Sequence, residues 1–325
     1  MNPQNDSAWD SFWRDTREQA AYKQDSPLDG ALAQFWTKLF IEEIPAYSQP
    51  RILDLVCGNG VVTQFAHDAI THLGTTRFSI HCVDYSPAAI AAVARRFSSV
   101  TGVVSDAKYI PFGDASFDIV VSQFGLEYAG IEAFAEAARL VRAGGRLAAI
   151  IHLKDGAIYR ENLSNKNAIA QIQQSHVLSC FDAYAEAFFS AQRGPAGAAA
   201  VQQADNRLAL AVKKLEQVLN TFGVHIAGGA AYALHSDLAH IYGGLPTYRP
   251  EDIRAWTKKH TAELEHYARR MSSMLHAAMD DDSIGSAIKA MEQHGLSMSR
   301  QEPLIIGNDA LPAAWVLVGV HEKQV

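Results

Sequence analysis

The sequence reads Arg51-Ile52-Leu53-Asp54-Leu55-Val56-Cys57-Gly58-Asn59-Gly60 where an apolar run meets an acid and a turn of small residues. Helical spacing of apolar residues begins directly afterwards, at Val61. This pattern predicts a buried strand, a tight loop and a helix. Glycine suits such a loop because it adopts positive φ and lets a ligand approach the backbone closely. The N–H groups and dipole of the helix favour an anionic group of that ligand.

The acid Asp54 distinguishes between two kinds of cofactor loop. A dinucleotide-binding loop has the spacing G-x-G-x-x-G, but Thr63 stands where the third glycine would be. Asp54 instead lies at the predicted strand end, four residues before Gly58. The segment resembles motif I of the class I S-adenosylmethionine-dependent methyltransferases, written D/E-x-G-x-G-x-G. Val56 departs from that motif, because it occupies the position of the first glycine.

A second strand is predicted over residues 78–84, and Ser86-Pro87 suits the start of the helix that follows. The resemblance implies that Asp84, at this strand end, accepts hydrogen bonds from the ribose hydroxyls of the cofactor. A carboxylate suits this role because its two oxygens are acceptors only. A third strand is predicted over residues 102–107, where the resemblance implies that Asp106 accepts from the adenine amino group and the Ala107 N–H faces the ring.

Two later segments also resemble the family, in the family's order. Residues 111–122 resemble the entry into strand four, and residues 140–147 resemble the glycine turn into strand five. Each match is weak by itself, because a single D-x-x-x-G-x-G pattern also occurs in ordinary turns that bind no cofactor. Together they predict an α/β fold with a doubly wound sheet. The resemblance implies seven strands, mostly parallel, in the order 3-2-1-4-5-7-6.

Residues at the ends of the fourth and fifth strands are candidates for chemistry, because ligands bind at the carboxyl edge of such sheets. Gln123 and Phe124 are predicted to line the cofactor. Glu127 and Tyr128 are candidates for the substrate side, although the same residues also suit a simple helix start. His152 ends the fifth strand and is a candidate general base, because imidazole titrates near neutral pH. The alternative for His152 is a hydrogen-bonded residue without a catalytic role.

The predicted site is therefore large. The candidate catalytic residues are His152, Glu127 and Tyr128. The candidate cofactor-binding residues are Asp54, Val56, Cys57, Gly58, Asn59, Gly60, Asp84, Tyr85, Asp106, Ala107, Gln123, Phe124 and Tyr22.

The chain is predicted to divide around this core, which spans residues 51–153. Residues 1–50 are rich in aromatic side chains at helical spacing, which indicates either a stripe packed on the core or an N-terminal helical lid in which Tyr22 precedes a hinge. Residues 154–294 show helical spacing interrupted by glycine and proline, and form a helical insertion between strands five and six that caps the substrate or makes an oligomer contact. Residues 295–325 are predicted to form a closing β-hairpin.

Composition limits the partners. The 325 residues carry a net charge of −7, and no long block of lysine and arginine occurs, which disfavours a nucleic-acid substrate. The polar N-terminus does not resemble a signal peptide, and no apolar run is long enough to span a membrane, so we expect a cytoplasmic protein. The three cysteines have no metal or disulfide spacing, and the acids at 280–282 suit a helix N-terminus better than a cation, so no metal is expected.

The predicted function is transfer of a methyl group from S-adenosyl-L-methionine to a small organic acceptor at O, N or C, with S-adenosyl-L-homocysteine as product. In-line positioning and exclusion of water supply much of the rate in such a reaction, and a base is needed only where the acceptor must lose a proton. The alternatives are a non-catalytic methyltransferase-like binding protein, a protein or RNA methyltransferase, and a nicotinamide-dependent oxidoreductase. A homodimer through the insertion is expected from the frequency of two-fold oligomers.

Overall fold

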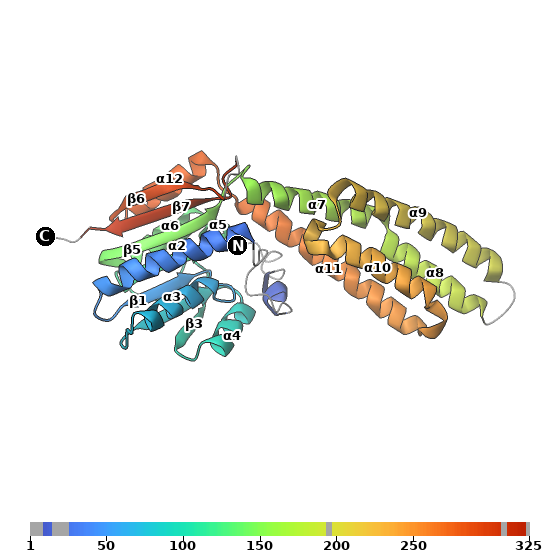
Figure 1. Cartoon of the computed structure of the whole chain (residues 1–325), viewed down its shortest axis with the longest axis horizontal. Helices are drawn as coiled ribbons and strands as arrows, with labels where there is room; N and C mark the ends of the chain where they lie inside the picture. The colour runs from blue at the N-terminus through green and yellow to red at the C-terminus, as the bar shows by residue number, and fades with distance from the viewer. Residues whose placement is uncertain (1–8, 15–25, 193–196, 307–310, 323–325) are drawn as a thin grey trace. The chain divides into compact units, whose positions relative to one another are not determined.

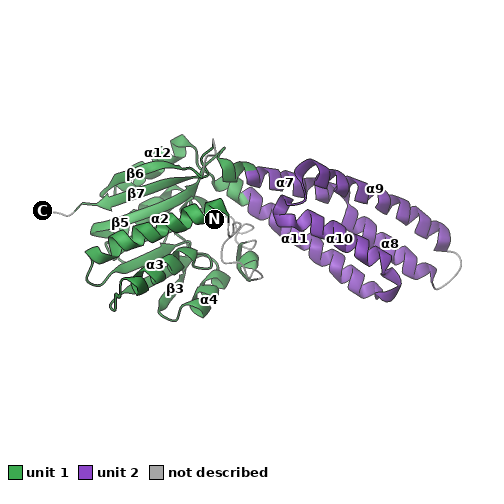
Figure 2. Ribbon diagram, in the orientation of Figure 1, with its two compact units in different colours: residues 1–160, 273–325 green, residues 161–272 purple. Residues whose placement is uncertain are grey.

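The computed structural model describes residues 9–14, 26–192, 197–306 and 311–322. The chain forms two compact units, one of residues 1–160 and 273–325 and the other of residues 161–272 (Figures 1 and 2). The first unit contains the sheet and the second is helical. The helical unit lies inside the predicted insertion of residues 154–294 and is shorter than it at both ends.

The sheet of the first unit has seven strands in the order β3-β2-β1-β4-β5-β7-β6, as predicted (Figure 1). Neighbours from β3 to β5 are parallel, whereas β7 pairs antiparallel with both β5 and β6. The strands are β1 (Arg51–Leu55), β2 (Ser79–Asp84), β3 (Val100–Val104), β4 (Phe117–Gln123), β5 (Val141–His152), β6 (Leu296–Leu304) and β7 (Ala314–His321).

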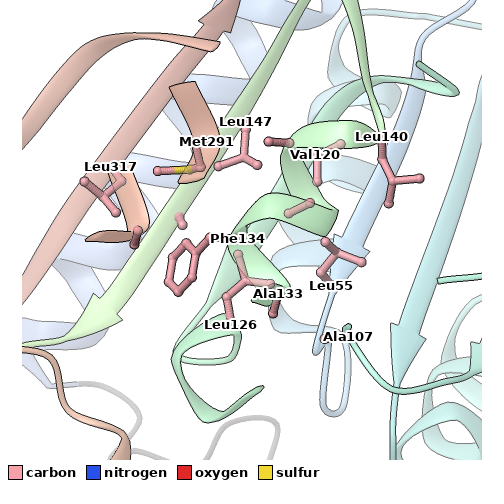
Figure 3. Close-up of a cluster of buried hydrophobic side chains, with 14 of the residues drawn as sticks. Leu55, Ala107, Val120, Leu126, Ala133, Phe134, Leu140, Leu147, Met291 and Leu317 are labelled. Carbon is pink, nitrogen blue, oxygen red and sulfur yellow. The ribbon is translucent and has the colours of Figure 1, made fainter. Parts of the chain in front are cut away.

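Side chains alternate between the two faces of the sheet, because successive residues of a strand point in opposite directions. In β1, Ile52 packs with one set of helices, and Leu53 packs with the other. The first set is α2 (Pro27–Glu43) and α3 (Val61–His72). The helices of the other face are α6 (Ile131–Arg139) and α12 (Asp281–Glu292), whose Phe134 and Met291 are fully buried beside Leu147 and Leu317 (Figure 3).

The N-terminal region predicted as a lid has two described parts in the first unit. Helix α2 belongs to the core, since Leu32, Trp36 and Phe40 are all fully buried. Residues 9–14 form a separate short helix that lies against the ends of β1 and β2. The remaining elements of the first unit are η1 (Ile44–Ala46), α4 (Pro87–Arg96) and α5 (Leu126–Ala129).

The helical unit has its own apolar core, built by residues such as Phe181, Leu215 and Ile253. Its helices are α7 (Ala157–Ser175), α8 (Val177–Ala191), α9 (Ala198–Phe222), η3 (Ile226–Gly229), α10 (Ala230–Gly243), η4 (Leu245–Thr247) and α11 (Pro250–Ala277). Helices α7 and α8 are separated by a break at His176, whose backbone is left-handed at φ 57°. The hydroxyl of Ser175 accepts from the Val177 N–H at 3.2 Å and offers the backbone an alternative to the helix at this break.

None of the helices in the described part of the chain has the length and apolar character required to cross a bilayer.

Candidate functional site

Asp54 ties the end of β1 to the first turn of α3. Its Oδ2 accepts from both the backbone N–H of Thr63, at 3.0 Å, and the Thr63 hydroxyl, at 2.6 Å. Burial raises the pKa of Asp54 to about 7, against the opposing effect of these hydrogen bonds. The acid therefore fixes the loop between strand and helix from the inside.

Asp84, at the end of β2, joins two loops through its two carboxylate oxygens. Oδ2 accepts from the Gly58 N–H at 2.9 Å, and Oδ1 accepts from the Ser86 N–H at 2.8 Å. Burial, opposed by these hydrogen bonds, raises the pKa of Asp84 to about 6, and the charge of Asp10 adds to the rise. Since each carboxylate oxygen has more than one lone pair, the side chain keeps acceptor capacity for a ligand.

The loop itself is closed by short backbone contacts. The Cys57 N–H donates to Val83 O at 3.1 Å, and the Gly60 N–H donates to Cys57 O at 2.8 Å. The Arg96 guanidinium donates to the Asn59 carbonyl. The loop is thus held from β2 and α4 as well as from its own strand.

Val56, which replaces the first glycine of the motif, is left-handed at φ 55°, a conformation that is unfavourable for a β-branched residue. A compensating glycine lies across from it. A Cβ placed on Gly125 would lie 2.5 Å from the Cβ of Val56 and 3.0 Å from Ser122 Oγ. The loop therefore accommodates Val56 because Gly125 has no side chain, a pairing that sequence reasoning missed because the two residues are far apart in the chain.

The third predicted acid lies just beyond its strand, since β3 ends at Val104. Oδ1 of Asp106 accepts from the Lys108 N–H at 3.0 Å, and Ala107 is 2% exposed. The Ser105 N–H donates to Asp84 O at 3.0 Å, so this loop lies beside the end of β2. Tyr85, which follows Asp84 directly after β2, is 43% exposed.

The end of β4 contacts α2 and β5. Oε1 of Gln123 accepts from Trp36 Nε1 at 2.5 Å, a contact across 87 residues that no local pattern in the sequence indicates. Phe124 is left-handed at φ 52°, and its ring lies 4.4 Å from the His152 ring. Phe124 thus contacts the candidate catalytic residue His152, whereas Gln123 contacts α2.

His152 and Glu127 form a buried pair. Oε1 of Glu127 lies 2.7 Å from Nδ1 of His152 and accepts from the His152 backbone N–H at 3.0 Å. The two side chains are 6% and 0% exposed. An ionised Glu127 requires the proton on Nδ1, which leaves Nε2 as the acceptor nitrogen of a neutral ring.

Tyr128 lies beside the pair, with its ring 5.9 Å from that of His152. Burial, together with the charge of Glu127, raises the pKa of Tyr128 well above its usual range. Burial therefore favours the neutral phenol at Tyr128.

The predicted site residues at the ends of β1, β2, β4 and β5 therefore lie at one edge of the sheet. Tyr22, the remaining candidate from the N-terminal region, lies outside the described residues. No group of three histidine, cysteine, aspartate or glutamate side chains suited to a metal ion occurs within the described ranges.

The contact between Val56 and Gly125 predicts a coupled pair of substitutions. Gly125→Ala is expected to lower the free energy of unfolding by about 1–3 kcal/mol, because the added methyl overlaps Val56. In the background of Val56→Gly, the same change is expected to cost at least about 1 kcal/mol less. Urea denaturation of the four proteins measures both values, and strictly additive effects would show that the two side chains do not compete for space.

The raised pKa values of Asp54 and Asp84 predict a pH dependence of stability. A folded-state pKa above the usual carboxyl value of about 4 means that the folded protein binds more protons, so stability falls as pH rises from about 4 to about 7. Asp54→Asn keeps an oxygen for Thr63 but does not titrate. We expect it to remove about 1 kcal/mol or more of that fall, measured by urea denaturation across this range. Asp68→Asn, on the exposed side of α3, is the control and should leave the slope unchanged.

Comparison with known proteins finds a family match over this part of the chain. Residues 52–145 match the family model described as "Methyltransferase domain". Demethylmenaquinone methyltransferase of Beutenbergia cavernae is 30% identical over 123 residues, which cover 37% of this chain and 48% of the relative. The Mycobacterium tuberculosis H37Rv protein of the same name is 33% identical over 118 residues, which cover 35% of this chain and 46% of the relative.

The chain thus spans about half the length of the curated relatives it matches. Among solved structures, an S-adenosylmethionine-dependent methyltransferase from Mesorhizobium loti is 22% identical, with a TM-score of 0.32 over 39% of this chain and 56% of that one. The family match over residues 52–145, together with the strand order of the sheet, confirms the resemblance of this part of the chain to the class I S-adenosylmethionine-dependent methyltransferases.

Proposed function

We propose that this protein transfers the methyl group of S-adenosylmethionine to a small organic acceptor. The observation that carries the proposal is the junction at Asp84, where one buried carboxylate joins the motif I loop to the start of α4 inside the matched segment. The sulfonium cofactor, when bound, supplies an electrophilic methyl group. The protein then has to hold the acceptor in line and keep water out.

The residues present suit such a cofactor. Asp84 retains acceptor capacity for two vicinal hydroxyls, and Asp106 with Ala107 lies beside it for a purine ring. Gly58 offers a backbone surface without a side chain. Asp54 and Asp84 are both buried at this edge, and the negative charge of their ionised forms would attract a cation.

We assign the proton transfer, where the acceptor requires one, to His152. Glu127 holds the imidazole by Nδ1 and thereby sets the tautomer in which Nε2 accepts a proton. Glu127 is in this view a positioning residue. The pairing resembles the arrangement of a base and its orienting carboxylate in other enzymes, which is recognised by geometry and not by sequence position.

A small acceptor is favoured over a macromolecule by the acidic net charge and by the names of the relatives, which are methyltransferases of demethylmenaquinone. The acceptor atom, whether O, N or C, is the part of the proposal that the transfer assay determines.

Cofactor binding is the first test. Titration calorimetry is expected to show binding of S-adenosylmethionine and S-adenosylhomocysteine, with NADH as a non-binding control. Asp84→Ala is expected to weaken both by at least about tenfold, or about 1.4 kcal/mol, because the ribose acceptors are lost. Asp68→Ala is the matched surface control. A wild-type protein that binds neither compound contradicts the proposal and favours a methyltransferase-like protein without a cofactor.

The His152–Glu127 pair is tested by transfer of radiolabelled methyl groups to a panel of small hydroxyl, amine and carbon acceptors, including reduced demethylmenaquinone. His152→Asn is expected to lower kcat by about 10²–10⁴-fold, while cofactor affinity stays within about twofold. Glu127→Gln is expected to lower kcat less and to shift its pH profile, whereas Tyr128→Phe retains activity. Full activity of His152→Asn on the accepted substrate would remove the base from the mechanism.

A further inference from the structure

Residues 9–14 form the N-terminal strap. The strap lies against the two segments that Asp84 joins, the loop at Gly58 and the start of α4. Oδ1 of Asp10 accepts from the Ser86 hydroxyl at 2.7 Å and from the Ala88 N–H at 3.1 Å. Ser86 is itself the N-cap of α4, since its hydroxyl accepts from the Ala89 N–H at 3.1 Å. One end of the strap is thus anchored at the start of α4, next to the carboxylate of Asp84.

The other anchor is the indole of Trp13, which covers Gly58. A Cβ built on Gly58 would lie 2.6 Å from Cζ2 and 2.9 Å from Cη2 of Trp13. Gly58 is left-handed at φ 52°, and its missing side chain is what lets the ring approach the backbone. The surface that the glycine leaves open for a ligand is therefore filled by a side chain of the protein itself.

The strap also reaches the candidate catalytic residues. The ring of Trp9 lies 5.8 Å from that of Tyr128 in an edge-to-face arrangement, and 6.1 Å from that of Trp13. Aromatic contacts thus run from Gly58 through the strap to Tyr128 and His152. A movement of the strap would uncover the cofactor loop and this part of the catalytic wall together.

We propose that the N-terminal strap is an intramolecular competitor of the cofactor: Trp13 takes the place over Gly58 that the cofactor requires, and the strap must leave before the cofactor binds. This inference rests on the proposed function, because it concerns the same site. The docked strap leaves Trp9 Nε1 buried without a hydrogen-bond partner among the described residues, and it brings the carboxylate of Asp10 near that of Asp84. Both features disfavour the docked state, so the strap is poised to open.

The test is the affinity for S-adenosylhomocysteine, measured by calorimetry on the full-length chain and on two variants. Trp13→Ala removes the covering ring and Asp10→Ala removes the anchor at α4. Both are expected to tighten binding, by up to about tenfold if the strap is docked for nine-tenths of the time, because the apparent Kd is the intrinsic Kd divided by the open fraction. Trp256→Ala, in the helical unit, is the control and should leave the Kd unchanged.

A second measurement follows the strap directly. Acrylamide quenching of tryptophan fluorescence is expected to increase when S-adenosylhomocysteine binds, because Trp9 and Trp13 both leave the site with the strap. This increase should vanish in the double variant Trp9→Phe/Trp13→Phe but persist in Trp256→Phe. Weaker binding by Trp13→Ala would overturn the proposal, since the indole would then cover a bound cofactor. An unchanged Kd in both strap variants would overturn it as well.

The outcomes separate the two proposals. Binding by the wild-type protein that becomes tighter in both variants supports the proposed function and the strap as a competitor. Binding by none of the three proteins contradicts the proposed function, and with it any competition at the site. Binding by the wild-type protein with unaltered or weakened variants leaves the proposed function in place and removes only the strap.

Discussion

The carboxylate of Asp84 is the interaction on which the candidate site depends. It accepts from Gly58 on one side and from Ser86 on the other, so the loop after β1 and the start of α4 share a single buried acceptor. Parallel pairing of β1 with β2 brings the ends of these strands together, and the acid converts that proximity into a fixed loop geometry. A buried acid without such donors would be strongly disfavoured. The same contacts that stabilise the loop therefore also set its shape for a ligand.

Much of this could be predicted from the sequence, because the informative signals are local. The acids Asp54 and Asp84 each end an apolar run and precede a helix start, and parallel strands necessarily bring such ends to one edge of the sheet. The resemblance to the methyltransferase family then implied the order of the strands in the sheet. The pair of His152 and Glu127 was also predictable in outline, since His152 ends β5 and Glu127 follows β4, and these two strands lie side by side.

The remainder could not be predicted, because it depends on contacts between residues far apart in the chain. Val56 looks unfavourable for its loop until Gly125 is placed across from it, and that requires β1 and β4 to be neighbours in three dimensions. The contact of Trp36 with Gln123 spans 87 residues, and that of Asp10 with Ser86 spans 76. The aromatic pattern of the N-terminal region did not reveal that Trp36 joins the core while Trp13 covers a glycine.

Charge connects the cofactor loop with the proposed chemistry. The pKa values of Asp54 and Asp84 are raised chiefly because these acids are buried. A ligand that brings positive charge to this edge would favour their ionised forms and lower those pKa values. A sulfonium has such a charge and a thioether does not, so under the proposed function buried carboxylates near the sulfur would favour the cofactor over the product. The difference is largest when both acids are ionised, which links discrimination between cofactor and product to the pH range above their raised pKa values.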